Sequence, residues 1–211
     1  MHIVLLGDSI FDNGAYVRSG EPDVVRQLQA RLPSGARATL RAVDGATTVG
    51  VARQLERLPS DATHLVVSAG GNDALGNIGV LEGSTRSIAD ALTRLAGIGD
   101  GFARAYRAML AAVLARGLPT ALCTVYDPRY PDPRFRRLAV AGLTLFNDVI
   151  ARAAFENGLP LLDLRLICGD DADFANPIEP SAKGGDKIAA AIARLVAEHD
   201  FGRRRSEVFV R

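Results

Sequence analysis

The sequence has few of the residues on which several classes of protein depend. Its 211 residues include two cysteines, three histidines and no tryptophan. Two cysteines exclude a disulfide-stapled scaffold and a four-cysteine zinc site. Basic and acidic side chains number 25 and 24, so no strong overall field attracts nucleic acid or an anionic membrane. Three histidines leave few candidates for a reaction that needs an imidazole.

Long apolar segments are also missing. No apolar run approaches the roughly 18–20 residues that span a bilayer. The first residues, Met1–Gly7, carry no basic segment, and their apolar stretch is shorter than the roughly 7–15 residues of a secretory signal core. We therefore expect a cytoplasmic protein with no membrane partner and no nucleic-acid partner, and its oligomeric state stays open.

Short apolar runs alternate with longer amphipathic segments along the whole chain. The predicted strands are His2–Leu6, Ala38–Val43, His64–Ala69, Thr120–Val125 and Leu159–Leu162. The predicted helices are Pro22–Leu32, Thr47–Leu58, Thr85–Leu95, Phe102–Arg116, Arg137–Asn157 and Ala182–Glu198. This alternation predicts an α/β fold with a parallel sheet covered on both faces. We expect one domain over residues 1–200 and a basic tail over 201–211, whose end alternates enough for an edge strand or a dimer contact.

Chemically distinctive residues follow the first three predicted strands. Ser9 comes directly after a Gly-Asp turn, Gly45 follows the second strand, and Asn72 follows a Gly-Gly turn after the third. Ligands bind at the carboxyl ends of strands in such sheets. A serine hydroxyl there is a candidate nucleophile, and backbone N–H and amide groups are candidate donors to an oxyanion.

At these residues the chain resembles the SGNH hydrolases, also called the GDSL esterase/lipase family. Gly7-Asp8-Ser9 matches the family's first block, and Gly70-Gly71-Asn72-Asp73 contains its Gly-x-Asn-Asp block. The resemblance implies a three-layer α/β/α, flavodoxin-like fold with about five parallel strands. It also implies hydrolysis of a small-molecule carboxylic ester, with a small acyl, acetyl or thioester group as substrate. Ser9 is then the nucleophile, and Gly45 and Asn72 form the oxyanion hole.

The family's last block, Asp-x-x-His, is altered. Asn176 stands where the family has the aspartate, and Glu179 stands where it has the catalytic histidine. The chain's own histidines do not replace it. His2 and His64 begin strands, about 15 Å from the carboxyl ends at about 3.3 Å per residue, and His199 follows the last helix.

Two interpretations therefore stay open. In the first, Glu179 is the base, which requires that burial raise its pKa toward neutrality. Asn176 adds no second negative charge there, and its amide is able to donate a hydrogen bond to Glu179. In the second, the chain is a binding module that kept the scaffold and lost efficient turnover.

Two further segments are expected to overhang the same edge. Ala74–Asp100 is long enough to be a lid or binding segment, or a structural excursion. Tyr126–Arg137 carries four arginines and two tyrosines, which suit an anionic or sugar ligand, or form a proline-stiffened loop. The acidic run Asp170–Asp173 lacks the spacing of a calcium loop, and no Gly-rich phosphate fingerprint follows the first strand. No metal and no cofactor is expected.

Overall fold

The centre of the molecule is a six-stranded parallel sheet with the order β2-β1-β3-β4-β5-β6. This computed structural model describes residues 1–210. The strands are β1 (His2–Gly7), β2 (Arg37–Leu40), β3 (His64–Ser68), β4 (Thr120–Cys123), β5 (Leu161–Leu162) and β6 (Val208–Phe209). The five predicted strands are all present, some of them shorter than predicted. The sixth comes from the basic tail and pairs with β5, so the tail completes the edge of the sheet.

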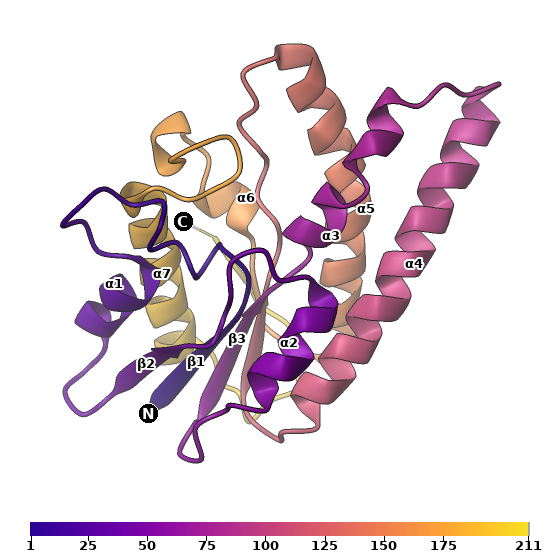
Figure 1. Ribbon diagram of the computed structural model, residues 1–211. Coiled ribbons are helices and arrows are strands. Elements are labelled where there is room, and N and C mark those ends of the chain that lie inside the picture. Colours follow the sequence, from indigo (N-terminus) through magenta and orange to yellow (C-terminus); the bar gives the residue numbers. More distant parts are fainter. Residues whose placement is uncertain (211) are drawn as a thin grey trace.

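Helices cover both faces of the sheet (Figure 1). The helices are α1 (Val24–Arg31), α2 (Thr48–Leu55), α3 (Gly71–Leu75), α4 (Ile88–Leu114), α5 (Pro133–Asn157), α6 (Leu164–Ile167) and α7 (Ala182–Glu198), with short 3-10 turns η1 (Ile78–Glu82) and η2 (Asp171–Asp173). One buried cluster lies between the sheet and α1 and α7, and a second lies between the sheet and α2, α4 and α5. The three-layer α/β/α prediction is confirmed.

The prediction of two separate helices over 85–95 and 102–116 is wrong, because α4 runs unbroken from Ile88 to Leu114. The glycines at 97, 99 and 101 suggested a break, since each lowers helix stability by about 1 kcal/mol relative to alanine. The buried side chains of Phe102, Tyr106 and Val113 fix the second half of the helix against the sheet. Tertiary packing therefore outweighs local propensity.

Helix α5 also has an unusual composition. By length and hydropathy it would be able to cross a membrane, although only 33% of its most apolar window is buried in the molecule. Leu143, Phe146 and Ile150 on its inner face belong to the core between the sheet and α4. A helix that packs on a sheet meets the same compositional criterion, so this is weak support for a membrane span.

The sheet order places the end of β1 at a special position. Successive strands go from β1 outward to β2 and then back to β3 on the other side, so the order reverses between β1 and β3. Crevices form at such switch points, outside the carboxyl ends of the strands. Gly7 ends β1 with φ 131°, and a Cβ there would lie 1.7 Å from the Ser68 carbonyl oxygen, so only glycine fits this turn. Gln54 on α2 bonds both the N–H and the carbonyl of Gly7, at 2.8 and 2.7 Å.

Candidate active site

Ser9 lies in the turn that follows β1. Its side chain is nearly buried, with 7% of the residue exposed. The turn is fixed because the N–H of Asp8 donates to the Ser68 carbonyl at the end of β3, at 3.2 Å, and the Asp8 carbonyl accepts from Phe11 at 3.1 Å. The backbone N–H of Ser9 has no acceptor among residues 1–210, so this donor is free to bind a ligand.

Glu179 is next to Ser9. It is 6% exposed, it lines the same cavity as Ser9, and its carboxyl is near enough to the Ser9 side chain for a polar interaction between them. Burial raises the pKa of Glu179 above its ordinary value, the polar Ser9 side chain lowers it, and the negative charge of Asp44 raises it further. Its Oε2 atom is buried without a hydrogen-bond partner in the described part of the chain. The carboxylate that replaces the expected histidine therefore lies against the candidate nucleophile.

A tight loop holds Glu179 in place. The side-chain oxygen of Asn176 accepts from the backbone N–H groups of Ile178 and Glu179, each at 3.0 Å. The Tyr126 hydroxyl donates to the Ile178 carbonyl at 2.7 Å, and Phe174 forms an antiparallel bridge with Pro180 that closes the loop. Asn176 thus accepts from the backbone of Glu179, whereas the sequence suggested that it donates to the carboxylate. In the structure, the role of the Asn176 side chain is to fix this turn.

The other two predicted site residues lie beside the same turn. Asn72, in the first turn of α3, donates from Nδ2 to the Ala46 carbonyl at 3.0 Å. Gly45 has φ +76° and a backbone N–H without an acceptor in residues 1–210. Its loop is joined to β1 by the bond from Val43 N–H to the Gly7 carbonyl, at 3.0 Å. Three strand ends therefore bring Ser9, Gly45 and Asn72 to one corner of the sheet.

Asp8 is a further residue of the site that the sequence pattern did not single out. It is 2% exposed and its Oδ1 accepts from the Ile10 N–H at 3.2 Å. Burial raises its pKa to about 7, and the nearby charges of Glu179 and Asp73 act in the same direction. The signal in the sequence was a carboxylate between the apolar run Ile3–Leu6 and the candidate nucleophile, where a charged group is poorly solvated.

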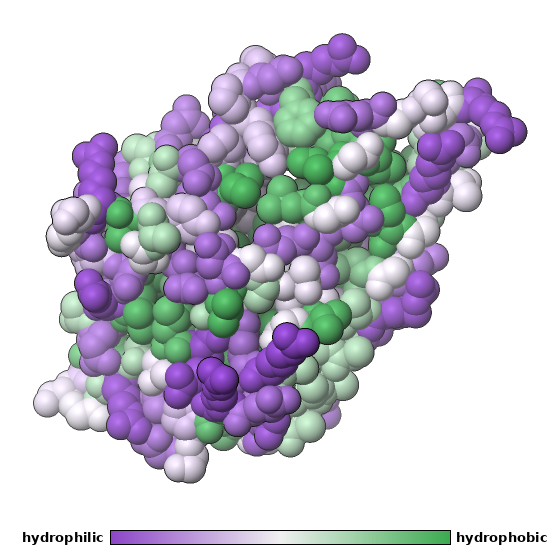
Figure 2. Space-filling model, in the orientation of Figure 1, coloured by the Kyte–Doolittle hydropathy of each residue, from purple (hydrophilic) through white to green (hydrophobic). Residues whose placement is uncertain are grey.

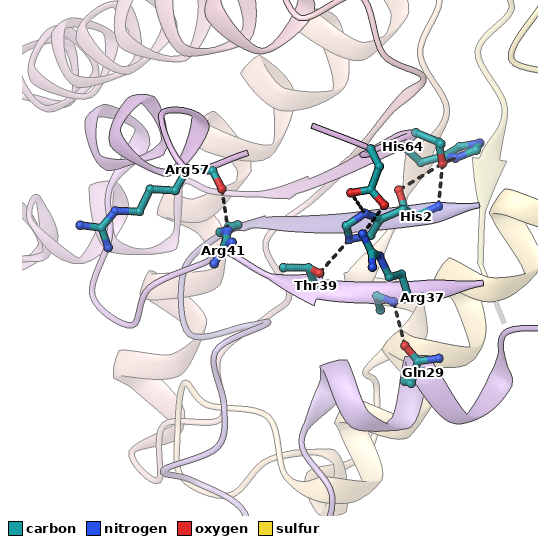
Figure 3. Close-up of polar contacts among 10 residues, drawn as sticks. His2, Gln29, Arg37, Thr39, Arg41, Arg57 and His64 are labelled. Carbon is teal, nitrogen blue, oxygen red and sulfur yellow. Dashed lines mark hydrogen bonds and ion pairs between the residues drawn. The ribbon is translucent and has the colours of Figure 1, made fainter. Parts of the chain in front are cut away.

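The histidines lie elsewhere, as predicted. Figure 3 shows His2 and His64 at the amino ends of their strands, where His2 contacts Thr39 through Nε2 at 2.8 Å and Asp61 through Nδ1 at 3.1 Å. His199 contacts Glu207 through Nδ1 at 2.8 Å. Each imidazole is thus bonded to groups outside the site.

The two charged loops near the site bind each other. Arg129 hydrogen-bonds to the Gly169 carbonyl, forms an ion pair with Asp171 at 3.5 Å and lies over the Phe174 ring. Arg136 also pairs with Asp171, at 3.8 Å. These two guanidinium groups therefore hold the loop that carries Glu179. Residues 1–210 contain no cluster of three histidine, cysteine or carboxylate side chains that would hold a metal ion.

An apolar cavity opens beside Ser9 and Glu179. Its volume is about 110 Å³, and it extends between α3 and η1 on one side and α5 on the other, with α4 behind. The Ala74–Asp100 segment supplies much of its wall, through Ala74, Leu75, Ile78, Val80, Leu81, Leu95 and Ile98. Hydrophobic residues reach the surface in this part of the molecule (Figure 2). The long segment after β3 is therefore a wall of the cavity.

Comparisons with known proteins agree with this architecture. The model of the GDSL-like lipase/acylhydrolase family matches residues 5–199. An extracellular lipase from Streptomyces rimosus is 20% identical with a TM-score of 0.63, over 92% of this chain and 99% of the lipase. The acetyl xylan esterase AlAXEase is 16% identical with a TM-score of 0.67, over 94% and 100%. A phospholipase A1 from Streptomyces albidoflavus is 17% identical with a TM-score of 0.65, over 93% and 97%. At these identities the structures show a shared fold, and no curated protein sequence matches the chain.

Proposed function

The chain belongs to the GDSL-like lipase/acylhydrolase family, and we propose that it hydrolyses carboxylic esters with Ser9 as nucleophile and Glu179 as general base. The observation that carries this proposal is the proximity of the Ser9 side chain to the buried Glu179 carboxyl in one cavity. A nucleophile next to a base that a third group positions is the arrangement required for acyl transfer. Here Asn176 is the positioning group, because it fixes the turn that carries Glu179.

In the first half of the reaction, Ser9 Oγ attacks the ester carbonyl carbon while Glu179 takes the hydroxyl proton. The carbonyl oxygen becomes an oxyanion beside the backbone N–H groups of Ser9 and Gly45 and the second N–H of the Asn72 amide. The two backbone groups have no acceptor among residues 1–210, so neither bond has to break before the oxyanion binds. The C–O bond to the alcohol then breaks, and Glu179 returns the proton to the leaving oxygen.

In the second half, a water molecule attacks the acyl-serine. Glu179 accepts a proton from the water, and the same donors hold the second oxyanion. Breakdown of this intermediate expels Ser9 Oγ, which regains its proton from Glu179, and releases the carboxylic acid. Proton and bond changes balance over the two halves, and each step uses residues that meet at the end of β1.

The environment of Glu179 matches the requirement for a carboxylate base. An ordinary glutamate is a weak base toward an alcohol, and its efficiency increases as its pKa approaches the working pH. Burial raises the pKa of Glu179, and the unpartnered Oε2 removes one source of stabilisation for the charged form. Arginines do not pair with Glu179 in the described chain, so none lowers its basicity.

The test is labelling by a fluorophosphonate probe, which reacts with activated serines, together with hydrolysis of p-nitrophenyl acetate. We expect wild type to be labelled once and Ser9→Ala not at all. Glu179→Gln is expected to slow both labelling and hydrolysis by about 10²-fold or more, the range for loss of a general base. Two exposed residues supply matched controls, Ser19→Ala and Glu156→Gln, which are expected to behave as wild type.

The same assay separates an enzyme from a binding module. An oxyanion hole alone accelerates the reaction by about 10³–10⁴-fold over water, so slow turnover is not sufficient support. Equal and slow labelling of wild type and Glu179→Gln would contradict the role of Glu179 as base. It would favour a binding module built on this scaffold.

A further inference from the structure

We propose that the cavity beside Ser9 binds a saturated acyl chain of about four to eight carbons, and that Gly142 and Leu81 in its wall limit its size. This inference rests on the proposed ester hydrolysis and names the acyl group that this reaction prefers. The sequence left a small acyl, acetyl or thioester group open as the substrate. The cavity favours a short- or medium-chain fatty acyl group.

The polarity of the cavity carries the first step of the argument. Asp8, Ser9, Asn72 and Glu179 lie where the ester carbonyl would be. Asn77 and Tyr126 also line the cavity, but their donors are already bonded to the Asp73 and Ile178 carbonyls. Elsewhere the walls are mostly aliphatic and aromatic, with Leu75 and Ile78 on one side and Leu143 and Phe146 on the other. A sugar or phosphate group would lose its hydration there without gaining partners, whereas methylene groups would be transferred from water to an apolar surface.

The size of the cavity carries the second step. An apolar cavity of about 150 Å³ in another protein holds benzene, with its six carbons. The present volume of about 110 Å³ therefore accommodates roughly four or more methylene groups beyond the ester carbonyl. An acetyl group has none beyond its methyl and would leave most of the cavity unfilled. By the same comparison of volumes, chains much longer than about eight carbons would exceed the cavity.

Gly142 on α5 and Leu81 in η1 come into contact where these two walls of the cavity meet. Both line the cavity, and a Cβ built at Gly142 would lie 3.9 Å from Leu81 Cδ2, an ordinary van der Waals contact. An alanine therefore fits at this position, while a larger side chain would have to enter the cavity or displace Leu81 within it. The absence of a side chain at Gly142 keeps the cavity open.

The experiment measures kcat/KM for p-nitrophenyl acetate, butyrate, hexanoate, octanoate and dodecanoate with wild type, Gly142→Leu and Leu81→Phe. Each methylene that becomes buried in the transition state raises kcat/KM by up to about fourfold. We expect the hexanoate-to-acetate ratio of wild type to be at least about 10, with no gain from octanoate to dodecanoate. Each variant is expected to lower this ratio about tenfold or more. Ala141→Leu, at an exposed neighbouring position of α5, is expected to keep the wild-type ratio.

The readouts separate the inference from the proposed function. Thermal unfolding of each variant shows whether it folds, and Leu81→Phe tests the opposite wall if Gly142→Leu does not fold. Ready hydrolysis of acetate with a hexanoate-to-acetate ratio near or below 1 would overturn the acyl-chain assignment and leave the ester hydrolase standing. Absence of both probe labelling and hydrolysis of every ester would overturn the proposed function, and the acyl assignment with it.

Discussion

The side-chain oxygen of Asn176 accepts a hydrogen bond from the backbone N–H of Glu179 at 3.0 Å. The same oxygen accepts from Ile178, so a single amide fixes the turn that brings the carboxyl to Ser9. An aspartate at this position would offer the same acceptor. The turn is therefore compatible with both the family's Asp-x-x-His block and the Asn-x-x-Glu sequence of this chain.

Replacing Asn176 separates this structural role from charge. Asn176→Ala removes both accepted hydrogen bonds, and we expect kcat/KM for hexanoate to fall about tenfold or more because the carboxylate is less well positioned. Asn176→Asp keeps the acceptor and adds a negative charge near Glu179, which raises the pKa of Glu179. We therefore expect its activity at high pH to stay near wild type and its pH–rate profile to move to higher pH. Loss of activity at every pH in Asn176→Asp, as in Asn176→Ala, would contradict the turn-fixing role.

The pH dependence of kcat/KM reports the base itself. Glu179 accepts a proton only when ionised, and its pKa is raised by burial. Activity is therefore expected to be lost as the pH falls through a value above 4.5, the ordinary pKa of a glutamate, and to level off above that value. Glu179→Gln is expected to lose most of the rate, and its remaining kcat/KM should no longer fall over this pH range. If Glu179→Gln still loses kcat/KM at low pH as the wild type does, and Asp8→Asn does not, the base would be Asp8.

Asp8 is expected to make stability fall as pH rises. Its pKa is about 7 in the folded chain and near 3.8 when exposed, so between these values only the folded state keeps the proton. Raising the pH across that interval therefore favours unfolding, by at most about 4 kcal/mol, and the effect ends above about pH 7. Asp8→Asn should remove most of this slope in urea unfolding measured at pH 5, 6, 7 and 8. A wild-type free energy of unfolding that rises over this range would contradict the assignment.

Sequence reasoning placed the candidate residues together, as the structure does, because the strand exits are local features. Ser9, Gly45 and Asn72 each follow an apolar run, and parallel strands bring their carboxyl ends to one edge whatever the helices do. The raised pKa of Asp8 could not be predicted from the sequence, because it depends on burial and on charges from residues 73 and 179, which are far away in sequence.

The full length of α4 could not be predicted from the sequence for a related reason. Three glycines within five residues are a local signal for a helix end, yet distant contacts decide the outcome at Phe102 and Tyr106. The same holds for the cavity, whose walls come from segments more than fifty residues apart, such as those carrying Leu81 and Gly142. The roles of the arginines at 129 and 136 also depended on a distant partner, Asp171.

Two glycines are expected to respond in opposite directions to alanine. Gly97 lies in an exposed part of α4 with open space at its Cβ position, so Gly97→Ala should stabilise the protein by about 0.5–1 kcal/mol. Gly184 lies in the first turns of α7, where a Cβ would be 2.1 Å from the Asp173 carbonyl oxygen. Gly184→Ala should therefore destabilise it by about 1–3 kcal/mol through overpacking. Chemical denaturation of both variants checks the pair, and equal effects would contradict the packing described for α7 and η2.

Rebuilding the histidine block tests whether the scaffold still supports an imidazole base. The carboxylate introduced by Asn176→Asp would hold the turn with one oxygen and leave the other free to accept from an imidazole at position 179. An imidazole is a better base than a carboxylate at neutral pH, and the wrong tautomer in a serine triad lowers kcat about 10⁴-fold. We therefore expect Asn176→Asp with Glu179→His to exceed Glu179→His alone at least about tenfold in kcat/KM at pH 8. Equal rates for the two would show that the carboxylate at position 176 does not orient the imidazole.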